Sequence, residues 1–149
     1  MSRTALSTGE KLRTLEACRV FAGVPAAERA VLAEMMRTEH VAAGELLFEA
    51  GEPSDCIYVV AAGALDVLLP GEAAPVRRLL PGDLLGEYGL LTEGARTATV
   101  RAPADALLLS LDYRRFRAFL LRYPEATLVL LKTAVARLVA AEGGRRLDS

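Results

Sequence analysis

The sequence places a carboxylate and a guanidinium, Glu87 and Arg96, on either side of a glycine-containing segment. Arginine offers a phosphate a planar, bidentate set of N–H donors. A carboxylate would repel a phosphate, but it accepts hydrogen bonds from hydroxyl groups, so the two residues together suit a phosphate joined to a sugar. The spacing alone leaves a second interpretation open, in which Glu87 and Arg96 pair with each other on a surface loop.

The segment 81–101 must position these two residues. Its residue pattern predicts a strand, a short helix and a second strand. A Pro-Gly turn and two leucines precede Gly86, and residues 87–91 are long enough for one or two helical turns. The run 97–101 alternates and is rich in β-branched residues, which indicates a strand. The first turn of a helix leaves backbone N–H groups unpaired, and Gly86 and Gly89 let a ligand approach the backbone closely.

Short apolar runs alternate with Gly and Pro turn signals between residues 41 and 111. The runs are Leu46–Phe48, Ile57–Val60, Leu65–Leu69, Val76–Leu80 and Leu107–Leu111. Many short strands with turn signals at close spacing indicate an all-β roll or barrel. We therefore expect a mainly β fold with flanking helices, in which residues 41–111 form the β-roll.

Helical periodicity is found on both sides of this region. Residues 1–11 are expected to be loose, and the N-terminal helices to lie within 12–40, with an apolar stripe in the second one. Two C-terminal helices are expected within 112–142: Asp112 is a good N-cap, and Tyr123-Pro124 separates the two. The last helix has apolar residues along one side, at Leu128, Leu131, Val135, Leu138 and Val139. We expect the glycine pair 143–144 to end it.

Composition excludes several classes of function. The 149 residues suit one domain, 52% apolar and 25% charged content is typical of a globular protein, and a net charge of −1 argues against nucleic-acid binding. No signal peptide is visible, and the C-terminal apolar run, interrupted by Lys132, is too short to span a bilayer. These observations predict a cytoplasmic protein that is not a transmembrane protein.

Metal and nucleophilic chemistry have little support. A jelly-roll metalloenzyme of the cupin type needs two or three histidines, whereas His40 is the only histidine and is expected in a helix-to-strand connection. Cys18 and Cys56 lack metal-ligand spacing and are expected to be buried thiols. We expect no catalytic residue, no metal and no cofactor.

The stretch 82–100 resembles the phosphate-binding cassette of the cyclic-nucleotide-binding domain family. This family includes catabolite activator proteins, regulatory subunits of cAMP-dependent protein kinase and cyclic-nucleotide-gated channels. The resemblance covers about residues 18 to 140 and is carried by Gly86-Glu87, Gly89-Leu90-Leu91, Arg96-Thr97-Ala98-Thr99-Val100, the turn 81–83 and a signature at 51–67. Ala95 replaces a commoner proline and Tyr88 a commoner aliphatic residue, and neither change removes a ligand-contacting group.

The resemblance implies a double-stranded β-helix, or jelly roll, of about eight strands in a single domain covering 1–149. It also implies that Arg96 holds the phosphate of cAMP or cGMP and that Glu87 accepts from the ribose 2′-hydroxyl. The binding residues would be Leu85, Gly86, Glu87, Tyr88, Gly89, Leu90, Arg96, Thr97 and Ala98. A side chain of the last helix, Leu138 or Arg137, would cap the base, with ordinary packing or solvent contact as the open alternative.

The expected function is a cyclic-nucleotide-binding regulatory module, with cAMP favoured over cGMP, whose C-terminal helices move on binding. An effector protein would be its partner, and the chain would be a monomer or weak dimer. Because few residues follow the last helix, we expect a single binding module without the DNA-reading domain of the catabolite activators, either as a stand-alone regulator or as part of a larger chain. The alternative is a degenerate module that serves only protein contacts, although such modules usually lose the arginine or the glutamate, and both are present here.

Overall fold

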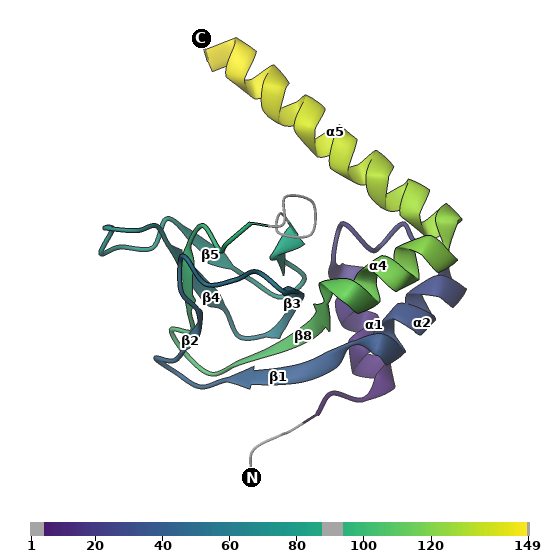
Figure 1. Cartoon of the computed structure of the whole chain (residues 1–149), viewed down its shortest axis with the longest axis horizontal. Helices are drawn as coiled ribbons and strands as arrows, with labels where there is room; N and C mark the ends of the chain where they lie inside the picture. Colours follow the sequence, from purple (N-terminus) through teal and green to yellow (C-terminus); the bar gives the residue numbers. More distant parts are fainter. Residues whose placement is uncertain (1–4, 88–93, 149) are drawn as a thin grey trace.

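The computed structural model describes residues 5–87 and 94–148, with only the backbone described at 137 and at 143–148. Its centre is a jelly roll of two four-stranded antiparallel sheets, in the orders β1-β8-β3-β6 and β2-β7-β4-β5 (Figure 1). The strands are β1 Arg37–Val41, β2 Leu46–Phe48, β3 Cys56–Ala62, β4 Leu65–Leu68, β5 Arg77–Leu79, β6 Leu84–Leu85, β7 Thr99–Arg101 and β8 Ala106–Asp112. The expected jelly roll with flanking helices is confirmed.

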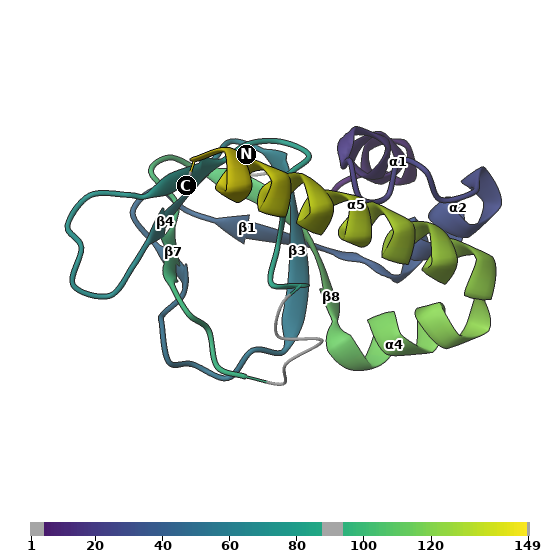
Figure 2. The ribbon, with the colours of Figure 1, turned by 90° about the horizontal axis from the view of Figure 1, so that it is seen from above.

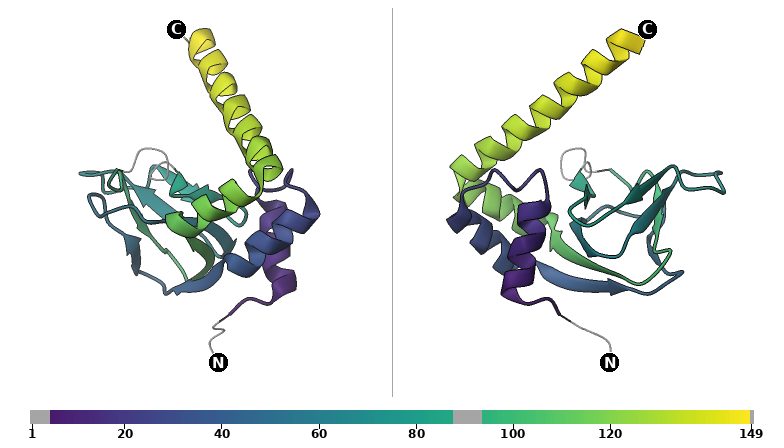
Figure 3. Two further views of the ribbon diagram at one scale, coloured as in Figure 1. Left: turned by 45° about the vertical axis from the view of Figure 1, so that its right-hand side comes forward. Right: turned by 180° about the vertical axis from the view of Figure 1, so that it is seen from behind.

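Helices gather at one end of the roll. They are α1 Thr8–Ala17, α2 Ala26–Met35, α4 Tyr113–Arg122 and α5 Pro124–Asp148. Figure 2, seen from above, shows α1 and α2 next to each other on one side of this end and α4 on the other side, where it continues from β8. The last helix, α5, starts next to α4 and runs obliquely across to the side of the roll, with its far end raised above the strands (Figure 3).

Two apolar cores share strand β3. Successive side chains of a strand point to opposite faces, so Ile57 and Val59 pack with the helices while Tyr58 and Val60 pack inside the roll. Phe21 and Phe116 extend the helical core in an edge-to-face contact with ring centroids 6.2 Å apart. The whole apolar run is therefore buried, because one strand serves as the wall of both cores.

The N-terminal helix begins earlier than expected. Ser7 caps α1 with a capping box: Glu10 N donates to Ser7 Oγ over 3.2 Å, and Ser7 N donates to Glu10 Oε1 over 2.9 Å. The prediction that residues up to 11 are loose is therefore wrong from residue 8 onward. The sequence signal was present, since Ser followed three residues later by Glu marks a helix start.

The first strand also begins earlier. Helix α2 ends at Met35, and β1 pairs with β8 from Arg37 to Val41. His40 therefore lies in a strand opposite Leu107, not in a connection. The expected helical region 12–40 is wrong at this end because pairing with a long neighbouring strand overrides local helical pattern.

At the other end of the chain, Asp112 caps α4 and the Tyr123-Pro124 boundary separates α4 from α5, as expected. The predicted stop at 143–144 is wrong: α5 continues to Asp148 and is 25 residues long. Glycine costs about 1 kcal/mol relative to alanine in a helix interior but does not break it. Strong helix formers on both sides of the pair permit the helix to continue.

Candidate functional site

A tight turn connects β6 to the cassette. Gly86 has a φ of +90°, a conformation that side chains with a Cβ rarely adopt. A Cβ at this position would lie 2.5 Å from the carbonyl oxygen of Cys56 and 2.8 Å from Arg96 Nη1. Only glycine therefore fits between the end of β6 and Glu87, which is the first helical residue after it.

The predicted cassette residues that the structure describes line one pocket. Its wall includes Leu85, Gly86, Glu87, Arg96, Thr97 and Ala98. The second sheet contributes an apolar wall of Val67, Leu79 and Val100, from three strands, and also Arg77. The empty space in the pocket, including its open mouth, is about 740 Å³. Three other predicted residues, Tyr88, Gly89 and Leu90, lie outside the described part of the chain.

Arg96 is held at the floor of this pocket. Its side chain is only 5% exposed, and Nη2 donates to the carbonyl oxygen of Cys56 over 3.1 Å. The guanidinium carbon lies 4.1 Å from the centre of the Phe48 ring and 5.6 Å from that of Tyr58, both within cation–π range. Its Nε is buried and has no hydrogen-bond partner among the described residues. Part of the guanidinium donor set is therefore uncommitted.

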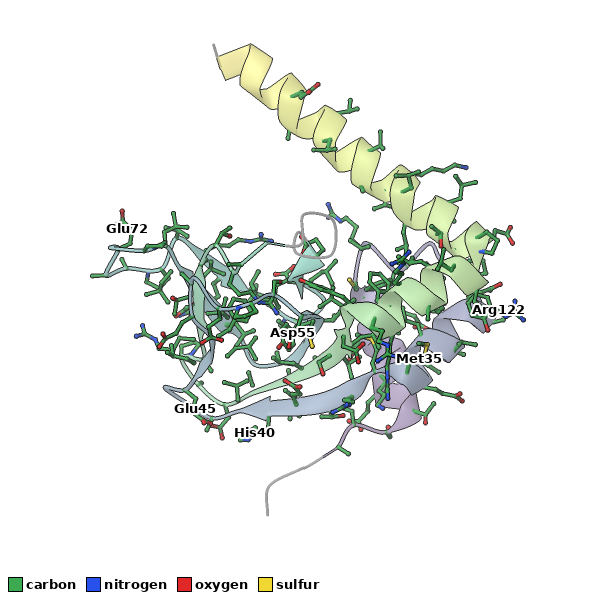
Figure 4. The ribbon with its side chains drawn as sticks, in the orientation of Figure 1. Met35, His40, Glu45, Asp55, Glu72 and Arg122 are labelled. Carbon is green, nitrogen blue, oxygen red and sulfur yellow. The ribbon has the colours of Figure 1, made fainter. Side chains whose placement is uncertain are left out.

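The ion-pair partner of Arg96 within the described residues is Asp55, at 3.6 Å from Nη2 to Oδ1, and not Glu87. The Asp55 side chain is 78% exposed, so solvent screens much of this attraction. Figure 4 labels Asp55 at the junction between the roll and α4. The open interpretation of Glu87 and Arg96 as partners on a surface loop therefore does not describe this arrangement.

The thiols have no reactive character. Burial, followed by the neighbouring Asp55 carboxylate, raises the pKa of Cys56 to about 11, and burial raises the pKa of Cys18 as well. Both cysteines are free; Cys18 is buried as expected, whereas Cys56 is only half-buried. The described residues contain no group of His, Cys, Asp and Glu side chains that could hold a metal ion. Thiolate or metal chemistry has no support in this part of the chain.

Several residues at the site were not predicted from the sequence. Phe48, Asp55 and Ser54 come from the segment around the β2–β3 connection, and Tyr113 comes from the start of α4. The Tyr113 hydroxyl donates to the carbonyl oxygen of Gly86. No periodicity marks such residues, because their roles arise from contacts between segments far apart in the chain.

The structure does not bring the predicted base cap to the pocket. Leu138 is 66% exposed on α5 and is not among the residues that line the pocket. Arg137, the other candidate, lies on the same projecting helix, and its side chain is outside the description. The predicted apolar side of α5 is likewise solvent-exposed, with Leu128 at 50% and Leu131 at 58%.

The jelly roll with its glycine turn and buried arginine defines a class of ligand-binding domain, and comparison with known proteins identifies it. The family model described as "Cyclic nucleotide-binding domain" matches residues 38–123. The chain belongs to this family, and the expectation drawn from the cassette motifs is confirmed.

Solved structures show the same fold. The N-terminal domain of a transcriptional regulator from Streptomyces coelicolor A3(2) has a TM-score of 0.79 and 30% identity, covering 89% of this chain and 94% of that chain. The regulatory domain of Toxoplasma gondii PKA, crystallised with cAMP, has a TM-score of 0.72 and 25% identity, covering 87% of this chain and 50% of that chain.

Curated relatives are longer proteins. An uncharacterized ABC transporter ATP-binding protein from Mycobacterium bovis is 42% identical over 83 residues, which are 54% of this chain and 25% of that protein. The chain thus spans about a quarter of the length of this relative. In the described part of the present chain, no helix has the length and apolar character needed to cross a membrane.

Proposed function

We propose that this chain binds a purine 3′,5′-cyclic nucleotide, with cAMP favoured over cGMP, and that binding moves its C-terminal helices. One observation supports this most strongly: Arg96 is buried in the pocket lining, beside the Gly86–Glu87 turn, and its Nε has no hydrogen-bond partner in the part of the chain that the structure describes. A buried donor without an acceptor is costly. A phosphate oxygen arriving in the pocket is the group that would satisfy it.

Each part of the pocket has a role in this proposal. Arg96 and the backbone N–H groups at the start of the cassette helix hold the phosphate, with Thr97 and Ala98 beside them. Glu87 accepts a hydrogen bond from the ribose 2′-hydroxyl. The base rests on the apolar wall from the second sheet. Tyr88, Gly89 and Leu90 are assigned to the same site from the sequence motif alone.

Support for cAMP comes from the Toxoplasma gondii regulatory domain, a similar structure that was crystallised with cAMP. Thr97 is compatible with either base, since its hydroxyl can reach a guanine amino group when the base is syn. The proposed output is the repacking of α4 and α5, through which an effector protein would sense the ligand. A cytoplasmic location and a monomeric or weakly dimeric state belong to the same proposal.

The alternative is a module that keeps the fold only for protein contacts. It is less favoured because Glu87 and Arg96 both line the pocket, and a module without a ligand has no need to bury an arginine there. The two proposals differ in a single measurable property, which is nucleotide affinity.

Calorimetry of the purified chain with cAMP and with cGMP tests the proposal. Arg96→Ala should weaken cAMP binding by ~30-fold or more, because it removes charge-assisted hydrogen bonds to the phosphate. Arg96→Lys should restore part of the loss, since lysine retains the charge but not the fork. Arg13→Ala, at an exposed arginine of α1, is the matched control and should bind like the wild type. No binding of either nucleotide by the wild type would support the degenerate module.

A further inference from the structure

Tyr113 joins three segments of the site. It is the first residue of α4, and its hydroxyl lies 2.5 Å from Ser54 Oγ while donating to the carbonyl oxygen of Gly86. Its backbone N–H donates to the carbonyl oxygen of Asp55 over 2.9 Å. The β2–β3 connection, the cassette turn and the start of the C-terminal helices therefore meet at one side chain.

The direction of these hydrogen bonds follows from the number of protons available. A tyrosine hydroxyl has one proton, and a backbone carbonyl can only accept. Tyr113 must therefore donate to Gly86, and Ser54 must donate to Tyr113. The hydrogen-bond chain runs in one direction, from the β2–β3 connection through α4 to the cassette.

This hydrogen bond orients the first peptide of the cassette helix. The Gly86 carbonyl and the Glu87 N–H belong to one planar trans peptide, so they point in opposite directions. Gly86 and Glu87 line the pocket, whereas Tyr113 is not among its lining residues. Holding the carbonyl towards Tyr113 thus fixes the direction of the Glu87 N–H, which is the donor that we expect to face an anion in the pocket. Glycine at position 86 would otherwise leave this peptide free to rotate.

A second connection reaches the phosphate-binding arginine. The Asp55 carboxylate lies 3.6 Å from Arg96 Nη2, and the carbonyl of the same residue accepts from the Tyr113 N–H. The two groups expected to contact an anion, the Glu87 N–H and the Arg96 guanidinium, are each connected to Tyr113 through one intervening group. These contacts connect both groups to the first residue of α4.

We propose that Tyr113 is a positioning residue for the anion-binding peptide, and that its hydroxyl couples occupancy of the pocket to α4. This inference rests on the proposed function, since it assumes that the pocket binds a cyclic nucleotide. It assigns the coupling to a directed hydrogen-bond chain between Ser54, Tyr113 and Gly86, in addition to any apolar contact between the cassette and the helices.

The test is Tyr113→Phe, which keeps the ring packed against the helical core and removes only the hydroxyl. Its affinity for cAMP should fall about 3- to 10-fold, the effect of losing one hydrogen bond. Ligand-induced changes in amide hydrogen exchange should persist at 94–98 but disappear at 114–117 when the variant is saturated. Ser54→Ala should give a smaller change of the same kind, because Tyr113 can still donate to Gly86.

Tyr123→Phe is the matched control. It lies at the other end of α4, and its hydroxyl makes no hydrogen bond within the described part of the chain. This variant should keep both the affinity and the exchange response. A purely structural role for Tyr113 would lower the melting temperature yet leave both readouts unchanged, and that result overturns the coupling while the nucleotide-binding proposal stands. Absence of cAMP and cGMP binding by the wild type would overturn both proposals.

Discussion

Arg96 is positioned before any ligand arrives. Its charge is buried against the faces of Phe48 and Tyr58, with the carbonyl of Cys56 and the carboxylate of Asp55 nearby. Each contact offsets part of the cost of removing a guanidinium from water. Burial raises the pKa of Tyr58, so its hydroxyl remains neutral beside the cation. A ligand therefore does not have to order this side chain, which reduces the entropy cost of binding.

The role of Glu87 can be tested with a ligand that lacks one hydroxyl. Glu87→Ala should weaken binding of cAMP about tenfold or more, because the ribose 2′-hydroxyl loses a charged acceptor. Binding of 2′-deoxy-cAMP should change little, since that ligand has no hydroxyl to donate. Calorimetry with both ligands and both proteins forms a double-mutant-type cycle that isolates the contact. Equal losses for the two ligands would mean that Glu87 acts through the fold and not through the sugar.

At the scale of elements, Asp112 connects the roll to the helices. It is the last residue of β8 and the N-cap of α4, where its Oδ1 accepts from the backbone N–H of Arg115 over 2.8 Å. No acidic residue lies in the first turn of α4. The cap is therefore the main negative charge that compensates the unpaired N–H groups and the helix dipole.

Asp112→Ala should lower the free energy of unfolding by about 1 kcal/mol, the usual effect of losing an N-cap. Asp112→Asn should retain most of the stability, because asparagine is an equally good cap. Urea denaturation followed by circular dichroism measures both variants. If alanine and asparagine prove equally stable, the capping hydrogen bond does not stabilise the start of α4.

Local signals in the sequence predict most of the fold. Turn residues located the strands around Leu46, Ile57 and Leu107, and Asp112 and Pro124 marked the helix ends. The errors arose where a signal was overlooked or overruled: the capping box at Ser7, the pairing of β1 with β8, and a glycine pair within α5.

The site was predictable only in part. The motif identified Glu87 and Arg96, and both line the pocket. The aromatic face of Phe48 contacts Arg96, and the hydroxyl of Tyr113 donates to Gly86, in each case from a segment tens of residues away. Contacts of this kind depend on sheet order and helix packing, which spacing along one strand or helix does not encode.

At the scale of the whole molecule, the base of α5 is anchored, whereas most of the described side chains farther along the helix are exposed. Ala126 is fully buried, and the Thr127 hydroxyl donates to the carbonyl oxygen of Leu120 over 2.6 Å, across the boundary between α4 and α5. Beyond this elbow the apolar residues Val135 and Leu138 are 49% and 66% exposed. The outer part of α5 therefore exposes apolar side chains. In the proposed mechanism these side chains could make different contacts with and without the nucleotide.

Removing the outer part of α5 tests whether it covers the ligand. A chain ending at Thr133 keeps Ala126, Val129 and Leu130, which pack on the helical core, so it should fold like the full chain. We expect it to bind cAMP about 3- to 10-fold more weakly, because the proposed movement of the helices on binding would bring α5 over the base. A dissociation constant equal to that of the full chain would show that α5 does not act as a lid.

The elbow between α4 and α5 has a mechanical consequence. At 1.5 Å per residue, the 25 residues of α5 form a rigid arm about 37 Å long. A rotation of about 10° at the Tyr123-Pro124 elbow would displace the far end of such an arm by about 6 Å. Hydrogen bonds at Tyr113 break or form over roughly 1 Å. If ligand binding rotates the helices as proposed, the length of the arm would convert a change of that size at its base into a displacement that a pair of spectroscopic labels can register.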